Sequence, residues 1–190
     1  MKEQKVYILL TDTGTIFSRL IKLYTRKPLN HASIAFDQQL LHVYSFGRKK
    51  SGNPFIAGFV KENIQGDLFK KASCAIYSCS ISEAQYNTML EKIKKMEAQK
   101  QLYKYNFLGV FAVVFNKRMD RKNAFFCSHF VATILDECGI NTPYQKPLSL
   151  VTPNDLKELP SLQLEYNGKL VYYLSHTGSE KRDPFTLLTC

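Results

Sequence analysis

The stretch "NAFFCSHFVATILDECGI" (residues 123–140) predicts a helix that begins at Cys127 and ends before Gly139, a residue suited to helix termination. Apolar residues recur at i+3 or i+4 spacing on one face, which must pack inward: Cys127, Phe130, Val131, Ile134 and Cys138. A cysteine in the first turn has two interpretations. It is core packing, because free cysteine is among the most buried residue types, or it is a nucleophile, because a helix N-terminus stabilises a thiolate.

Several strand patterns surround this helix in the chain. The apolar run 5–11 predicts a buried strand, and the runs 31–36 and 40–47 predict a hairpin joined by a short polar turn. Further strands are predicted near 54–63 and 72–80. The Asn167-Gly168 pair predicts a second hairpin over 162–174.

Helical patterns lie between these strands. The segment 14–27 has helical spacing and stops before Pro28, and 82–99 opens on a capping box formed by Ser82 and Gln85. A buried helix is predicted at 106–116, and Thr152-Pro153 starts another. Helices mixed with mostly antiparallel hairpins are typical of an α+β fold.

The length and hydropathy of the chain limit the number of domains and the kinds of targeting or membrane segment that it can contain. Its 190 residues predict one domain over 1–175 and a flexible tail over 176–190. The longest apolar run, 107–115, is far shorter than the roughly 18 residues that a membrane span needs. The apolar run near the N-terminus is too short for a secretory signal, so a cytoplasmic location is expected.

The formal charge of +10 predicts attraction to anions. Basic residues cluster in 47–50, 91–104 and 116–123, which fits an anionic ligand, a membrane surface or simply a solvated face. Nucleic acid is not favoured, because aromatic residues beside basic ones are sparse outside 103–107.

The five cysteines indicate neither a disulfide framework nor a metal site. They stand at positions 74, 79, 127, 138 and 190, an odd number without a signal peptide. Cys74 and Cys79 would face opposite sides of one strand, and no CxxC pair exists. We therefore expect no metal and no other cofactor.

A cysteine nucleophile needs a lowered pKa, a base and a group that orients the base. The first turn of a helix packed on a sheet points toward the sheet, so the base should come from a strand. His31 begins the first strand of the predicted hairpin and His42 lies in the second; a turn centred near residue 38 leaves it open whether they share a face. His129 projects about 200° away from Cys127, and His176 lies in the tail. The residues favour Cys127 with His31, and His42 as the orienting group.

Two quoted segments carry a resemblance to a known family. "NHASIAFDQQLLHVYSFG" (30–47) followed by "FFCSHFVATIL" (125–135) resembles the circularly permuted papain-like fold of the NlpC/P60 superfamily, in which the histidine hairpin precedes the cysteine helix. The YiiX-like amidases and the lecithin:retinol acyltransferase group share this order, and the likeness covers roughly residues 5–175. The resemblance implies an antiparallel sheet packed against helices that include the Cys127 helix.

The resemblance also implies roles for the site residues. Cys127 would be the nucleophile and His31 the base, and His42 matches the third position in the second strand, with Tyr44 and Ser45 as fallbacks. Acyltransferase relatives carry a histidine at that position, and amidase-like relatives often carry a glutamate. The Cys127 backbone N–H and one further donor would hold the oxyanion. The candidates for that donor are Tyr24, Tyr103 and Tyr105.

Three functions follow as alternatives. The first is a cysteine amidase or peptidase that acts on a small amide, such as a peptidoglycan fragment or a γ-glutamyl-type peptide. The second is an acyltransferase or esterase that acts on lipids through a thioester. The third is a non-catalytic binding module with a basic face, which a thiol of ordinary reactivity would favour.

Overall fold

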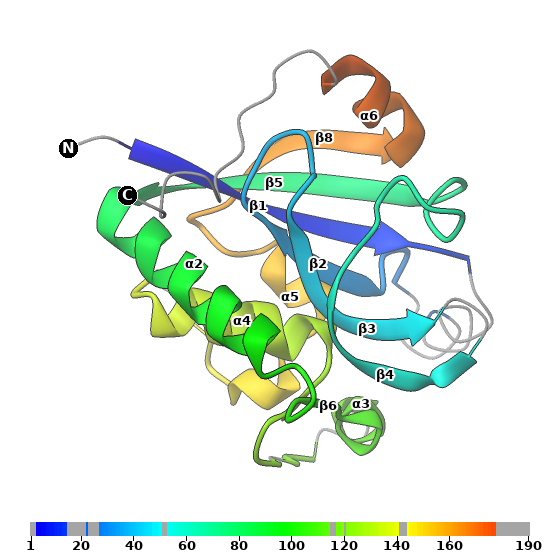
Figure 1. Cartoon of the computed structure of the whole chain (residues 1–190), viewed down its shortest axis with the longest axis vertical. Coiled ribbons are helices and arrows are strands. Elements are labelled where there is room, and N and C mark those ends of the chain that lie inside the picture. Colours follow the sequence, from blue (N-terminus) through cyan, green and yellow to red (C-terminus); the bar gives the residue numbers. More distant parts are fainter. Residues whose placement is uncertain are drawn as a thin grey trace.

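One mixed sheet organises the protein. The computed structural model describes residues 3–14, 22, 27–50, 53–114, 117–119, 121–140 and 144–177. Within these residues eight strands form a sheet in the order β7-β6-β4-β3-β2-β1-β5-β8 (Figure 1). All neighbours are antiparallel except β6 and β7. The strands are β1 Glu3–Asp12, β2 His31–Ala35, β3 Val43–Lys50, β4 Asn53–Lys61, β5 Ser73–Ser82, β6 Lys104–Tyr105, β7 Ala124–Phe125 and β8 Gln163–Lys169.

Helices lie between and after the strands in the sequence, which confirms the mixed α+β class. They are α2 Glu83–Ala98, α3 Phe107–Val114, α4 Cys127–Glu137, a 3₁₀ turn Leu148–Leu150, α5 Pro153–Leu156 and α6 Leu170–Thr177. In Figure 1, α2 and α4 lie together on one side of the sheet, and α6 lies beside β8. No helix in the described ranges is long and apolar enough to cross a membrane.

The sheet is buried on both faces. In β1, Val6, Ile8 and Leu10 enter the core cluster that includes residues of α2, α4 and α5, whereas Tyr7 and Leu9 enter a second cluster with α6 residues. This alternation explains why the strand reads as a continuous apolar run. The cysteines of β5 divide in the same way, with Cys74 in the second cluster and Cys79 in the first.

Several predicted helix ends are confirmed. Ser82 and Gln85 form the capping box of α2, and Thr152 caps α5 with Pro153 in its first turn. Gly139 follows α4 with a φ of +72°, the left-handed conformation that glycine adopts without strain. The helical segment predicted at 14–27 lies almost entirely outside the described residues.

The second predicted hairpin is wrong. Asn167 and Gly168 lie inside β8, where they pair with Ala75 and Cys74 of β5, and the chain then enters α6 instead of turning back. A Cβ at Gly168 would lie 2.7 Å from the hydroxyl of Tyr166. The close approach of this side chain is therefore a reason for a glycine at position 168 that does not involve a turn. The predicted tail starts within α6, and residues 178–190 are outside the described part.

Helix α3 is less buried than its sequence predicts. Leu108 keeps 55% of its surface exposed, although Ala112 is buried. The helix therefore packs one side inward and presents an apolar side chain to solvent.

The strand β2 separates from β3 where α4 begins. The two strands pair only at Ile34 with Tyr44 and Ala35 with Val43, whereas β2 pairs with β1 over five positions. At Ala32 the carbonyl accepts the Ser45 hydroxyl at 2.7 Å, and the backbone N–H is directed to the Cys127 sulfur. The first turn of α4 therefore enters the opening between two strands.

Phe130 anchors α4 to this part of the sheet. It is 1% exposed, and its ring centroid lies 5.3 Å from that of Phe46 and 5.8 Å from that of Phe59. We expect Phe130→Ala to lower the free energy of unfolding by about 3–5 kcal/mol, measured by urea denaturation. Leu164→Ala, at an exposed position of β8, should change it by less than about 0.5 kcal/mol, and equal effects would contradict this role.

Candidate active site

Cys127 is the first residue of α4 and lies buried at the opening between β2 and β3. The residue before it, Phe126, makes no side-chain cap for the helix. Backbone N–H groups of Ala32 and Ser128 instead point to the Cys127 sulfur. These donors favour a thiolate, as does the N-terminus of the helix itself.

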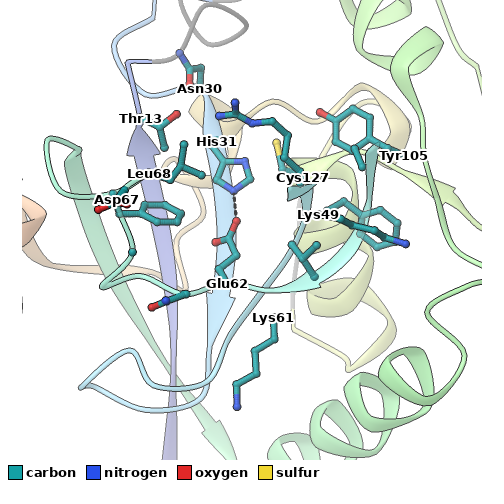
Figure 2. Close-up of a pocket in the computed structure, with 18 of the residues that line it drawn as sticks. Thr13, Asn30, His31, Lys49, Lys61, Glu62, Asp67, Leu68, Tyr105 and Cys127 are labelled. Carbon is teal, nitrogen blue, oxygen red and sulfur yellow. Dashed lines mark hydrogen bonds and ion pairs between the residues drawn. The ribbon is translucent and has the colours of Figure 1, made fainter. Parts of the chain in front are cut away.

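His31 is the first residue of β2, and its ring lies between a thiol and a carboxylate. Its Nε2 lies 2.7 Å from Oε1 of Glu62, so Nδ1 is the ring nitrogen left to hydrogen-bond Cys127. Figure 2 shows the imidazole with Glu62 on one side and the Cys127 sulfur near the other. The structure thus brings together the two residues that the sequence favours for catalysis.

Glu62 follows the last residue of β4, and hydrogen bonds fix both its backbone and its carboxylate. Its backbone N–H donates to the Val43 carbonyl at 2.8 Å, and its Oε2 accepts the Ser33 hydroxyl at 2.5 Å. Gly47 lies beside the pair, at a position where a Cβ would make ordinary van der Waals contacts with Glu62 Oε1 at 3.5 Å and with His31 Cε1 at 3.6 Å. The carboxylate therefore meets the imidazole in a fixed orientation.

The three groups shift one another's pKa values. Burial lowers the pKa of His31, but the charge of Glu62 and the hydrogen bonds to Cys127 and Glu62 outweigh it and raise that pKa to about 10. Burial raises the pKa of the Cys127 thiol, but the hydrogen bond and charge of His31 and the N–H groups of Ala32 and Ser128 lower it overall. These shifts favour a thiolate–imidazolium pair over a neutral thiol and imidazole.

His42 does not take part in this constellation. Its Nδ1 lies 3.3 Å from Oδ2 of Asp37, at the turn that joins β2 and β3. Asp37 also accepts the backbone N–H groups of Leu41 and His42, and this broad turn shifts the register so that Tyr44, not His42, faces Ile34. The side chain of His42 therefore points to the same face of the sheet as that of Ile34. His31 is three residues before Ile34, so its side chain points to the opposite face. The orienting position that the sequence assigns to His42 is filled by Glu62.

We expect His42→Ala to leave the chemistry of Cys127 almost unchanged. The rate of Cys127 alkylation by iodoacetamide should stay within about twofold of wild type at every pH, because the thiolate's partners remain in place. Intact-protein mass spectrometry would measure this rate. A large decrease in the alkylation rate would show that His42 contributes to the reactivity of Cys127.

The other two histidines lie outside the wall of the pocket beside Cys127 in the described structure, and one of the three candidate tyrosines belongs to that wall. His129 packs its ring against Phe125 and Phe126, and His176 is exposed on α6. Tyr103 packs against the core near Phe46, whereas Tyr105 lines the pocket; Tyr24 lies outside the described residues.

A pocket of about 490 Å³ opens onto Cys127, His31 and Glu62. Its wall combines basic side chains with apolar ones: Arg48, Lys49, Lys61, Phe46, Val60, Leu68, Phe69 and Phe107. Tyr105 lies in this wall beside Cys127 (Figure 2). Burial and the charge of Cys127 raise the pKa of Tyr105 although Arg48 opposes this, so the phenol keeps its proton at neutral pH.

The structure adds Glu62, Ser33 and Arg48 to the site. Glu62 lies near the end of the predicted stretch 54–63 and one residue after β4 ends, and only the pairing of β3 with β4 brings it opposite Val43. A carboxylate at the end of the strand that follows the hairpin is the signal that could have identified it. Among the described residues, no group of three or more His, Cys, Asp and Glu side chains is placed to hold a metal ion.

The chain matches no protein-family model, no curated protein and no solved structure at a significant level. The geometry of Cys127, His31 and Glu62 therefore has to carry the functional argument.

Proposed function

We propose that the protein is a cysteine-dependent hydrolase that cleaves a small amide through a thioester on Cys127. The observation that carries this proposal is the His31 imidazole held between the Cys127 thiol and the Glu62 carboxylate, next to a pocket. This arrangement supplies a nucleophile, a base and a positioning group, which together make up the general pattern of covalent catalysis.

The reaction begins with attack of the thiolate on the amide carbonyl carbon, which forms a C–S bond and an oxyanion. The His31 imidazolium gives its proton to the leaving nitrogen, and the C–N bond breaks to leave a thioester. Water then attacks the thioester carbonyl carbon while His31 takes its proton. The C–S bond breaks, the carboxylic acid is released, and the thiolate–imidazolium pair re-forms. Glu62 is a positioning residue that fixes the ring and stabilises the imidazolium.

Tyr105 is the proposed second donor to the oxyanion, beside the backbone N–H of Cys127. Its protonated hydroxyl lines the pocket near the nucleophile. We expect Tyr105→Phe to lower the acylation rate by about 10²-fold, a typical loss for one oxyanion donor. Tyr103→Phe is the matched control and should change the rate by less than twofold, because Tyr103 packs against Phe46. Equal rates in both variants would remove Tyr105 from the mechanism.

The resemblance to permuted NlpC/P60 proteins supports the same reading. The histidine strand β2 precedes the cysteine helix α4 in the chain, in the order of the permuted members. The group beside His31 is a glutamate, which favours the amidase-like relatives over the acyltransferases, although it follows β4 and not β3. A peptidoglycan fragment or a γ-glutamyl-type peptide is the proposed substrate class.

Acylation of the protein by model substrates tests the proposal. A panel of peptide anilides and nitrophenyl esters should give a hydroxylamine-sensitive acyl adduct at Cys127, detected by mass spectrometry after acid quench. Cys127→Ala should abolish the adduct, whereas Cys138→Ala, which removes a buried cysteine at the other end of α4, should keep it. No adduct with any substrate, combined with ordinary thiol reactivity, would favour a binding module.

The apolar part of the pocket favours a second candidate, a lipid acyltransferase or esterase. Val60, Leu68 and Phe107 are partly exposed apolar side chains of this wall that an acyl chain can contact. This candidate predicts faster acylation by long-chain esters than by peptides, and transfer of the acyl group to an added amine or alcohol.

A further inference from the structure

Exposed apolar side chains gather near the start of α3. Leu102 and Leu108 are 53% and 55% exposed, and Met119 is 37% exposed. The Nδ2 of Asn106, which directly precedes α3, donates to the Met119 carbonyl at 3.2 Å, so Met119 lies next to the helix start. These three residues are the exposed apolar side chains of the segments next to β6 and α3, which Figure 1 shows below α2 and α4, and we call them the apolar patch.

Exposed basic side chains lie in the same segment of the chain as this patch. The exposed cations of the segment are Lys100, Lys104, Lys117, Arg118, Arg121 and Lys122. Backbone pairing brings Lys104 close to Arg121 and Lys122, because the Lys104 N–H donates to the Asn123 carbonyl at 2.9 Å and Ala124 pairs with both Lys104 and Arg121. The segment 100–122 holds one acidic residue, Asp120, which is outside the described residues. We name the three apolar residues and six cations the α3 surface.

We propose that the α3 surface docks the protein on an anionic lipid membrane. Aliphatic side chains that project among cations match a bilayer interface, where the cations meet phosphate headgroups and the leucines enter the acyl boundary. A single-stranded nucleic acid would instead require exposed aromatic rings for stacking. Among the side chains that the structure describes in this segment, the exposed apolar ones are leucine and methionine, and the nearby rings of Tyr105 and Phe107 line the pocket.

The position of the α3 surface gives docking a consequence. Tyr105 and Phe107 belong to the pocket wall, and Asn106 between them contacts the Met119 carbonyl. The surface and the pocket are therefore contiguous, and a docked protein would hold its pocket close to the lipid. The docking itself does not require the chemistry of Cys127, so the inference stands independently of the proposed function.

Co-sedimentation with vesicles tests the inference. The full chain should bind vesicles of phosphatidylcholine with 30% phosphatidylglycerol and bind pure phosphatidylcholine far more weakly. The double variant Lys104→Gln/Lys122→Gln should lower the partition coefficient about 25-fold, since each cation contributes about fivefold. Leu102→Ser/Leu108→Ser should lower it at least tenfold. Cys127→Ala should bind as wild type does.

Matched variants elsewhere on the surface control for general effects. Leu164→Ser/Val171→Ser removes side chains that are 53% and 50% exposed on β8 and α6, and Lys71→Gln/Lys157→Gln removes two exposed cations. Both should bind vesicles within twofold of wild type. Equal losses in these controls, or equal binding to neutral vesicles, would overturn the proposal. So would binding of single-stranded DNA or RNA that is weakened by the α3 variants, with no binding to vesicles.

Discussion

Replacing His31 with alanine is expected to slow acylation of Cys127 by about 10⁴-fold with whichever model amide or ester acylates the wild type best. The loss combines two effects of one side chain. In the proposed mechanism His31 lowers the pKa of Cys127, and its imidazolium supplies the proton that the leaving nitrogen needs. Single-turnover kinetics followed by mass spectrometry would measure the loss.

The pH dependence of alkylation separates the first effect from the second. Because His31 lowers the pKa of Cys127, the wild-type rate with iodoacetamide should be constant from neutral pH downward and fall only when acid protonates the thiolate. His31→Ala removes this effect, and a thiol with the ordinary pKa of about 8.5 is only about 0.3% thiolate at pH 6. A thiolate of higher pKa is more nucleophilic, which offsets part of this difference. We expect a net loss of about tenfold at pH 6 and more at pH 5.

His176→Ala is the matched histidine control, because His176 is exposed on α6. Its pH profile should coincide with that of the wild type. A His31→Ala profile that also coincides with the wild type would show that Cys127 is an ordinary buried thiol, and the catalytic proposal would fail.

Local patterns account for what the sequence predicts well. The i+3/i+4 spacing of α4 puts Phe130, Val131 and Ile134 in the core, and this places Cys127 at the sheet. A base for Cys127 must then come from a strand of the sheet, and His31 at the start of β2 is the residue that hydrogen-bonds the thiol. Caps at Ser82 and Thr152 depend on neighbouring residues only, so they are readable from sequence.

Long-range pairing accounts for what the sequence misses. Asn167-Gly168 has the composition of a tight turn, but pairing with β5 keeps it extended. Likewise the position of Glu62 depends on the register of β3 with β4 and on the opening between β2 and β3, which no local pattern specifies. One hairpin considered alone favours His42 as the orienting group, whereas the structure places Glu62, from the end of the next strand, beside His31.

The role of Glu62 leads to the second large effect. Glu62→Gln keeps the size of the side chain but removes its charge, and the new amide can donate a hydrogen bond to Nε2 of His31. That bond would leave the proton of a neutral ring on Nδ1, facing Cys127, where the ring cannot accept the thiol proton. We expect the acylation rate to fall by about 10³-fold. Ser33→Ala, which removes only the donor to Glu62 Oε2, should cost less than tenfold.

A purely structural role for Glu62 would not move the titration of Cys127, so the pH profile decides between the two roles. Burial lowers the pKa of His31, and the charge of Glu62 is the largest of the effects that oppose it. Without that charge the pKa of His31 should fall, the imidazolium should be lost at neutral pH, and the pKa of the Cys127 thiol should rise. The acid limb of the alkylation profile should therefore move to higher pH in Glu62→Gln and stay in place in Ser33→Ala. An unshifted profile in Glu62→Gln, with a thermal unfolding midpoint equal to that of the wild type, would mean that the carboxylate does not control the thiolate.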